Sequence, residues 1–113
     1  MRNAIVILNY NGVQHLQTYL PSAIANSPNW ELIVADNAST DASVSYLRTN
    51  FPQIEVIQLK QNYGFAGGYN QALAQLEGKY ELYFILNSDV RLSPNWDTPL
   101  LAYLAAHPQV AAV

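Results

Sequence analysis

The chain has 113 residues, of which 50% are hydrophobic and 12% charged, with a formal net charge of −3. This composition supplies enough apolar surface for one folded domain and excludes a disordered segment. The basic residues are few and scattered, which argues against nucleic-acid binding, and the absence of cysteine excludes disulfides and thiolate metal sites.

Four short apolar runs recur along the chain, at residues 4–8, 32–35, 54–59 and 82–86. Each lacks polar alternation over most of its length, which is typical of strands covered on both faces in a parallel sheet. None approaches the roughly 18–20 apolar residues that span a bilayer, and the first is too short for a signal peptide. The sequence therefore predicts a cytoplasmic protein without a transmembrane segment.

Segments with helical spacing of apolar residues follow these runs. Pro21 is expected to kink or restart the first helix, Ser39 or Thr40 to cap the second with Asp41 in its first turn, and Gly78 to end the third. The apolar stripes consist of Leu16, Leu20, Ala23 and Ile24; Val44, Leu47 and Phe51; Ala72, Leu73 and Leu76; and Leu100, Leu101, Leu104 and Ala105. The alternation predicts an α/β fold, an open, mostly parallel Rossmann-like sheet with helices on both faces.

The last four residues, 110–113, are apolar and have the pattern of a further strand that is just beginning. A domain rarely ends on an apolar strand. We therefore expect residues 1–113 to be one domain truncated at its C-terminus. A homo-oligomer, in which another copy covers this segment, is an alternative.

Polar residues collect directly after each predicted strand. The segments are "NYNG" at 9–12, "DNASTD" at 36–41, "KQNYG" at 60–64 and "NSD" at 87–89. The carboxyl ends of parallel strands lie along one edge of the sheet, where ligands of open α/β sheets bind in the crevice at which strand order reverses. The pattern thus favours a binding site at that edge.

Each segment also has a simpler explanation. "DNASTD" contains the usual residues of turns and helix caps, and "NSD" can form an Asx-type turn. The glycines of "GFAGGYN" at 64–70 can serve only a tight turn before a helix, since the segment matches neither a dinucleotide-binding nor a P-loop motif.

Asn87 and Asp89 are the most informative pair, because side chains two residues apart in an extended segment point the same way. A carboxylate at the crevice edge suits Mg²⁺ or Mn²⁺, which takes one or two protein oxygens and completes its shell with phosphates and water. Such a cation neutralises a diphosphate leaving group as its bond breaks. The pair is therefore a candidate metal site.

Together the segments resemble the nucleotide-binding half of the inverting family 2 glycosyltransferases, which have a GT-A fold. The matching pieces are "VILNYNG" at 6–12, "IVADNASTD" at 33–41, "QNYGFAGGYNQAL" at 61–73 and "FILNSDV" at 84–90. They occur in the family's order and most resemble the rhamnosyltransferase-like subgroup that builds bacterial surface polysaccharides. The resemblance implies transfer of a sugar, with inversion, from a nucleoside-diphosphate sugar to a hydroxyl of a saccharide or lipid-linked acceptor. It places the protein in the cytoplasm, with the inner face of the membrane as an alternative.

The resemblance also implies roles for individual residues. Leu8 and Tyr10 would border the base, Asp36 would accept a hydrogen bond from it, and Asn37 stands where many members have a second aspartate. The wall beside the nucleoside and diphosphate would be formed by Gly64, Gly67, Gly68 and Asn70.

The resemblance makes Asn87, Ser88 and Asp89 the D-x-D-like element, with Asp89 as the ligand of Mn²⁺ or Mg²⁺ and Asn87 in place of the first aspartate. Ser88 stands where proline is common, and Tyr69 where asparagine is common. No residue in 1–113 matches the acidic general base that deprotonates the acceptor, so this base is expected beyond residue 113.

Two alternatives to the glycosyltransferase remain at this point. A sugar-nucleotide nucleotidyltransferase would need a glycine-rich, basic loop after the first strand, where "NYNGVQHL" has one glycine and no Lys or Arg. A non-catalytic, truncated nucleotide-binding or interaction module would account for the missing general base.

Overall fold

The computed structural model describes residues 2–113, in which strands and helices alternate along the chain. The elements are β1 (Asn3–Asn9), α1 (Val13–Ala25), β2 (Glu31–Asp36), α2 (Ser43–Asn50), β3 (Glu55–Gln58), α3 (Gly64–Leu76), β4 (Leu82–Leu86) and α4 (Thr98–Ala106). The four strands predicted at the apolar runs and the four helices that follow them are therefore present, with shifted ends. No helix within residues 2–113 is long and apolar enough to cross a membrane.

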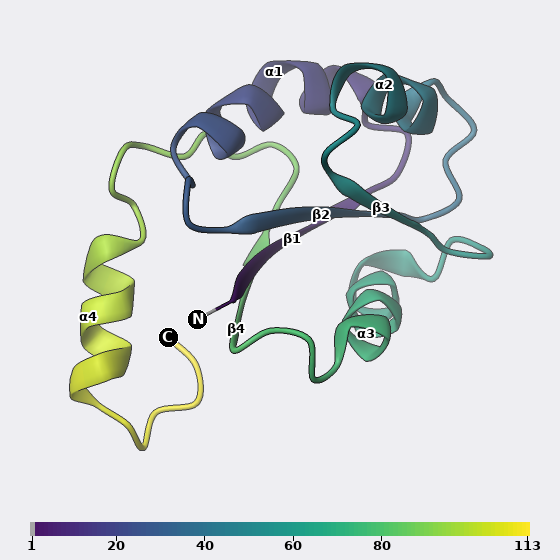
Figure 1. The fold of residues 1–113 in the computed structure, drawn as a ribbon. Coiled ribbons are helices and arrows are strands. Elements are labelled where there is room, and N and C mark those ends of the chain that lie inside the picture. The colour runs from purple at the N-terminus through teal and green to yellow at the C-terminus, as the bar shows by residue number, and fades with distance from the viewer. Residues whose placement is uncertain (1) are drawn as a thin grey trace.

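The four strands are parallel and lie in the order β3-β2-β1-β4 (Figure 1). The chain moves outward from β1 to β3 and then returns to the other side of β1. The β1–β2 ladder runs on to Asn9 opposite Asp36, whereas the β1–β4 ladder ends at Ile7 opposite Leu86. The order in which strands are added therefore reverses at β1, since β2 and β3 lie on one side of it and β4 on the other. A ligand crevice is expected at this point, between β1 and β4.

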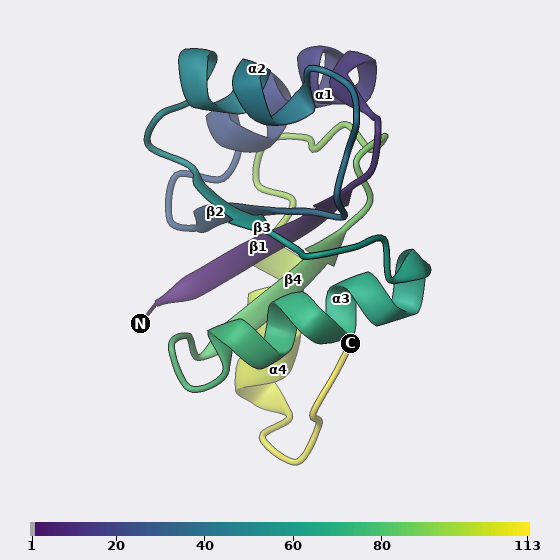
Figure 2. The same ribbon diagram turned by 90° about the vertical axis from the view of Figure 1, so that its right-hand side faces the viewer.

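Helices cover both faces of the sheet: α1 and α2 lie above the strands and α3 lies below them (Figure 2). Alternate residues of β1 join different cores, Ile5 and Ile7 on the α1 and α2 side, and Ala4 and Val6 on the α3 side. Because both faces are buried, the strand needs no polar alternation. The predicted α/β fold class is thus confirmed.

The fourth helix, α4, is joined to the sheet by an aromatic cluster. The rings of Trp30, Phe84 and Trp96 lie with centroids 4.3–6.2 Å apart. Trp30 Nε1 donates to Asp97 Oδ2 at 2.8 Å, and Trp96 Nε1 donates to Ser27 Oγ at 3.0 Å. Both indoles therefore bury their rings and keep a partner for their N–H group.

Two local predictions about the helices were wrong, and a third was wrong in part. Pro21 lies inside α1, which continues to Ala25, so the helix does not restart there. The second helix starts at Ser43 after Ala42, so neither Ser39 nor Thr40 caps it, because the Ser39 side chain is engaged with the loop after β1 instead. Helix α3 already begins at Gly64, which makes the glycine-rich segment its first two turns.

The expected strand at residues 110–113 is also not formed. Within residues 2–113, the outer edge of β4 has no hydrogen-bonded partner strand, and the terminal residues Ala111, Ala112 and Val113 contribute instead to a hollow beside β4 and α4. A strand requires such a ladder, so apolar composition alone does not produce one.

Candidate functional site

A hollow of about 420 Å³ lies at the carboxyl ends of β1 and β4, where the strand order reverses. We call it the switch-point hollow. It brings together the predicted site residues Leu8, Tyr10, Asn37, Gly64, Asn87, Ser88 and Asp89, together with His15, Asn62, Phe65 and Tyr69. The predicted residues Asp36, Gly67, Gly68 and Asn70 do not line it.

The loop after β1, which carries Tyr10, is fixed by the loop after β2. Asn11, with φ 49°, accepts hydrogen bonds at its Oδ1 from the N–H groups of Thr40 at 2.7 Å and Asp41 at 3.1 Å. The Asn11 N–H donates to Ser39 Oγ at 2.9 Å, and the Val13 N–H donates to Asp41 Oδ2 at 3.2 Å. Hydrogen bonds with the loop after β2 therefore hold the wall of the hollow that Leu8 and Tyr10 form.

Asp41 is part of this loop-to-loop contact. Slight desolvation would raise the pKa of its carboxyl, but hydrogen bonds from Ser43 and from the Val13 N–H outweigh it and hold the pKa below its ordinary value. The carboxylate therefore stays ionised at neutral pH and keeps both loops in contact.

Asp36 lies beneath the loops and is 2% exposed. Its Oδ1 accepts from Asn9 Nδ2 at 3.0 Å and Ser39 Oγ at 2.7 Å, and its Oδ2 accepts from the Ser39 N–H at 2.9 Å. These contacts join β1 to the loop after β2. The hydrogen bond that Asp36 is predicted to accept from a base stays a prediction.

Asn37, which does line the hollow, connects β2 with the start of α3. Its Oδ1 accepts from the Tyr63 N–H at 2.9 Å, and its Nδ2 donates to the Gly64 carbonyl at 3.0 Å. The side chain is 98% buried by these contacts, so it sets where α3 begins relative to the sheet.

The glycines of α3 differ in how closely they pack against β1 beneath the hollow. A Cβ on Gly68 would lie 2.7 Å from Leu8 Cδ1 and 2.9 Å from Asn37 Nδ2, whereas one on Gly67 would meet only Tyr63 Cβ, at 3.2 Å. Gly68 therefore allows the helix to approach β1 closely, and Asn70 lies exposed on the helix.

We expect Gly68→Ala to lower the free energy of unfolding by about 1 kcal/mol, because the added methyl displaces Leu8 and the hydrogen-bonded Asn37. Gly67→Ala is the matched control, and the better helix propensity of alanine should leave it neutral or stabilised. Urea denaturation of both variants measures the difference, and equal losses would contradict the close packing at Gly68.

Phe65 and Tyr69 lie within residues 64–70, the stretch that the resemblance assigns to a wall of the pocket, but sequence reasoning did not single out these two aromatic residues of the hollow. They lie one helical turn apart, with ring centroids separated by 5.2 Å, and Phe65 is 66% exposed. Their i, i+4 spacing would have indicated a shared helix face, had the helix been expected to start at Gly64. Burial raises the pKa of the Tyr69 phenol, although the hydrogen bond from Leu8 opposes this shift, so the hydroxyl keeps its proton.

The turn after β4 supplies hard oxygen donors to the hollow. Asn87 and Asp89 are exposed and Ser88 is half-buried, and the three side chains provide an amide oxygen, a hydroxyl and a carboxylate. This donor set fits Mg²⁺ or Mn²⁺. Within residues 2–113, three or more His, Asp or Glu side chains nowhere cluster into a preformed cage, so a cation here would need ligands from a bound molecule and water.

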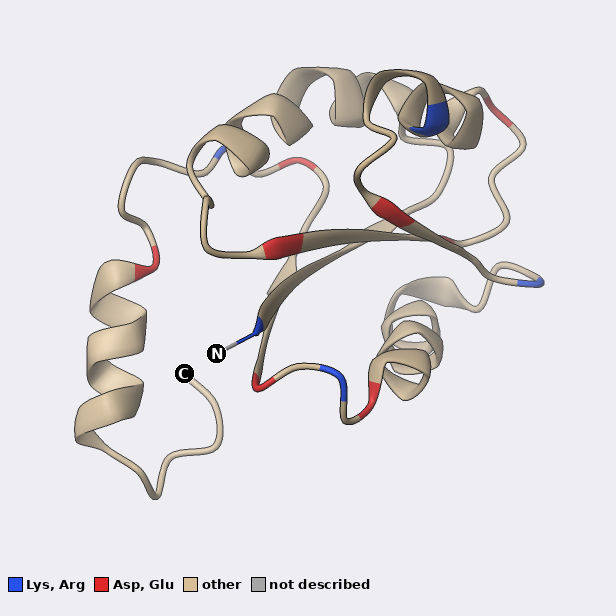
Figure 3. Cartoon of the chain, viewed as in Figure 1, with Lys and Arg blue, Asp and Glu red and all other residues tan. Residues whose placement is uncertain are grey.

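The charge of the residues that line the hollow also favours a divalent cation. Its lining contains the carboxylate of Asp89 but no Lys or Arg, and acidic and basic residues are scattered over the chain (Figure 3). A diphosphate bound here would therefore meet no cationic side chain of the lining. A divalent cation at Asp89 would supply the missing positive charge.

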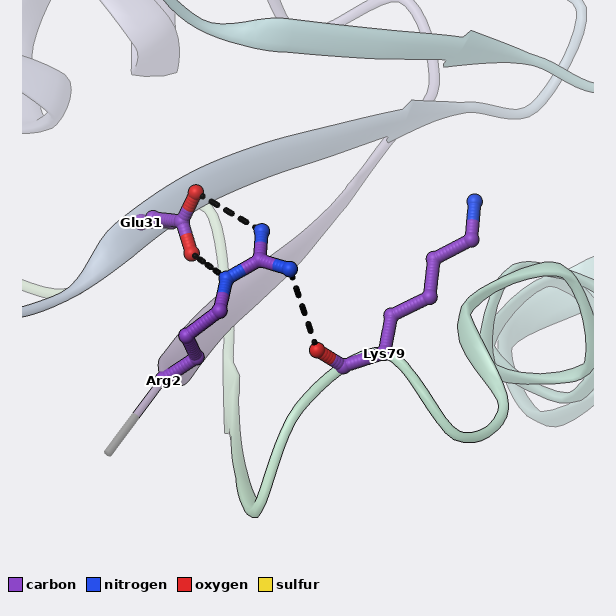
Figure 4. A network of polar contacts seen from close by, with 3 residues as sticks. All are labelled: Arg2, Glu31 and Lys79. Carbon is purple, nitrogen blue, oxygen red and sulfur yellow. Dashed lines mark hydrogen bonds and ion pairs between the residues drawn. The ribbon is translucent and has the colours of Figure 1, made fainter.

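A second hollow of about 470 Å³ lies at the opposite edge, beside the amino ends of β2 and β3. Of its two carboxylates, Glu31 and Glu55, the first is already paired with Arg2, whose Nε and Nη2 lie 3.0 and 3.1 Å from the Glu31 oxygens, while Nη1 donates to the Lys79 carbonyl at 3.4 Å (Figure 4). This exposed clasp ties the starts of β1 and β2 to the loop before β4. We therefore regard the switch-point hollow as the candidate site.

The fold and this hollow define an open α/β protein with a crevice at the reversal point of its sheet. The chain belongs to glycosyl transferase family 2, whose sequence model matches residues 4–113. A relative, TuaG of Bacillus subtilis, is named as a teichuronic acid biosynthesis glycosyltransferase and is 30% identical over 90 residues, which cover 76% of this chain and 35% of TuaG.

Solved glycosyltransferase structures share the fold. S. aureus TarS in complex with UDP-GlcNAc aligns with a TM-score of 0.77 at 23% identity, over 96% of this chain and 32% of that one. The mannosyltransferase PcManGT from Pyrobaculum calidifontis, in complex with GDP-Man and Mn²⁺, aligns with a TM-score of 0.76 at 21% identity, over 92% and 32%. The GT-A-like fold is therefore confirmed, and the chain spans about a third of the length of two curated relatives that it matches.

Proposed function

We propose that residues 1–113 form the donor-binding part of a glycosyltransferase and hold a nucleoside-diphosphate sugar with Mn²⁺ or Mg²⁺ in the switch-point hollow. The observation that carries this proposal is the lining itself, in which the Asp89 carboxylate faces a hollow without Lys or Arg. A metal bound at Asp89 would neutralise the charge that develops on the diphosphate leaving group.

The two walls of the hollow suggest how the donor lies. Tyr10, which is 49% exposed, offers a ring face to the base beside Leu8 and Asn37, because an exposed aromatic ring can stack on a flat base. The diphosphate would then reach Asn87, Ser88 and Asp89 on the opposite wall. Gly64 and Phe65, at the start of α3, would close the third side.

We extend the proposal to a reaction for a polypeptide of the length of the relatives. Such a protein would transfer the sugar, with inversion, to a hydroxyl of a saccharide or lipid-linked acceptor in bacterial cell-surface polysaccharide synthesis, as in the rhamnosyltransferase-like subgroup. The family membership and the name of TuaG support this context. The transfer would take place in the cytoplasm, at the inner face of the membrane where the acceptor is lipid-linked, with a general base from outside residues 1–113.

Titration calorimetry of the chain with UDP, dTDP and GDP, with and without Mn²⁺, tests donor binding. We expect at least one of these nucleotides to bind, and its affinity to fall about tenfold or more when the metal is removed, because the lining of the hollow contains no Lys or Arg. Absence of binding for all three with Mn²⁺ present would refute the proposal.

The same titration separates the nucleotidyltransferase alternative. That enzyme would bind a nucleoside triphosphate in preference to the diphosphate and release pyrophosphate when a sugar 1-phosphate is added. The lining does not favour it, since the larger charge of a triphosphate would also meet no Lys or Arg there. Pyrophosphate release would decide for this alternative.

A further inference from the structure

We propose that Tyr69 is a positioning residue that fixes the separation between the two walls of the switch-point hollow, and thereby the reach between base and metal. This inference rests on the proposed donor binding. Tyr69 lies on α3, is 6% exposed, and forms the floor of the hollow between the end of β1 and the end of β4.

The Tyr69 hydroxyl makes one hydrogen bond to each wall. It donates to the Leu86 carbonyl, the last residue of β4, at 2.8 Å, and it accepts from the Leu8 N–H of β1 at 3.3 Å. The β1–β4 ladder ends at this place, with Ile7 opposite Leu86. The hydroxyl therefore continues the connection between the two strands just where their own pairing stops.

The two walls are otherwise held in different ways. Leu8 and Tyr10 belong to a segment that the loop after β2 also fixes, through Asn11 and Ser39. The turn of Asn87, Ser88 and Asp89 starts directly after Leu86, and within residues 2–113 the side chains of these three residues make no hydrogen bond to the rest of the chain. The Tyr69 hydroxyl thus holds this turn through the carbonyl of the residue that directly precedes it.

Tyr83 offers a matched control in the same two elements. Its hydroxyl donates from β4 to the Leu76 carbonyl of α3 at 2.6 Å, so it also joins α3 to β4, but at the far end from the hollow. Tyr69→Phe and Tyr83→Phe each remove one tyrosine-to-carbonyl hydrogen bond. Tyr69→Phe also removes the acceptor of the Leu8 N–H, so we expect it to lose somewhat more free energy of unfolding than Tyr83→Phe.

The test compares both variants with the unaltered chain for UDP or the preferred nucleotide with Mn²⁺, for the nucleoside alone, and for Mn²⁺ in the presence of the nucleotide by electron paramagnetic resonance. We expect Tyr69→Phe to weaken metal-dependent nucleotide binding about five- to tenfold, and to leave nucleoside affinity within about twofold. Tyr83→Phe should bind like the unaltered chain.

Amide NMR shifts provide a second measurement that is independent of affinity. Tyr69→Phe should shift the signals of residues 8–10 and 87–89, and Tyr83→Phe should shift neither group. Nucleotide binding by Tyr69→Phe at the unaltered level, or equal weakening of nucleoside and nucleotide, would overturn the positioning role. If the unaltered chain binds no nucleotide at all, the proposed function fails first and takes this inference with it.

Discussion

Asp89→Asn is expected to abolish the metal-dependent part of nucleoside diphosphate binding. The substitution keeps the shape of the side chain but removes the carboxylate that faces the switch-point hollow, whose lining has no Lys or Arg to replace the metal. Loss of even an outer partner of a metal ligand costs roughly 10- to 100-fold in metal affinity, so loss of the ligand itself should cost at least about tenfold in nucleotide affinity. Calorimetric titration with and without Mn²⁺ measures the change.

Glu77→Gln is the charge-matched control, because Glu77 follows the end of α3 and does not line the hollow. It should leave both affinities unchanged. If Asp89→Asn retains the metal dependence of the unaltered chain, the cation is bound elsewhere and the assignment of Asp89 is wrong.

Asp36→Ala is expected to lower the free energy of unfolding by about 2–4 kcal/mol. The buried carboxylate accepts hydrogen bonds from Asn9 Nδ2, the Ser39 N–H and Ser39 Oγ, and its removal leaves these donors unpaired beneath the loops. Urea denaturation measures the loss. Nucleotide affinity should fall as well, because the loop that carries Tyr10 is held by the same contacts.

Asp41→Ala provides the comparison within the same loop, since Asp41 is exposed and accepts from the Val13 and Ser43 N–H groups. Its expected loss of stability is smaller, because water can replace the carboxylate at both donors. If Asp36→Ala unfolds like the unaltered chain but loses its preference among bases, Asp36 contacts the base after all.

The fold was predictable because local and global signals agree. Ile5 and Val6 lie on opposite faces of β1, and both are apolar. Few structures other than a parallel sheet covered on both faces require this pattern. The start of α3 was not predictable by the same logic, because glycines have poor helix propensity. Gly68 is helical there because only glycine lets α3 lie against Leu8 and Asn37, a tertiary requirement that overrides propensity.

The site was predictable to the extent that topology determines it. Tyr10 and Asp89 line the same hollow because they lie just after β1 and β4, the two parallel strands between which the strand order reverses. Asp36 also follows a strand, yet its side chain turns under the loops, since Asn9 and Ser39 supply donors in that direction. Strand position therefore indicates the edge at which a residue lies, whereas local hydrogen bonds decide whether its side chain reaches the ligand.

The unequal anchoring of the two walls has a consequence for the entropy of binding. The segment with Tyr10 is already ordered by Asn11 and Ser39, so a nucleoside meets a surface that loses little freedom on contact. The turn with Asp89 keeps side-chain rotamers that a metal and diphosphate must immobilise. In the proposed complex, binding of the nucleoside would therefore cost little conformational entropy. Binding of the diphosphate and metal would cost more, because the side chains of the turn have to be ordered.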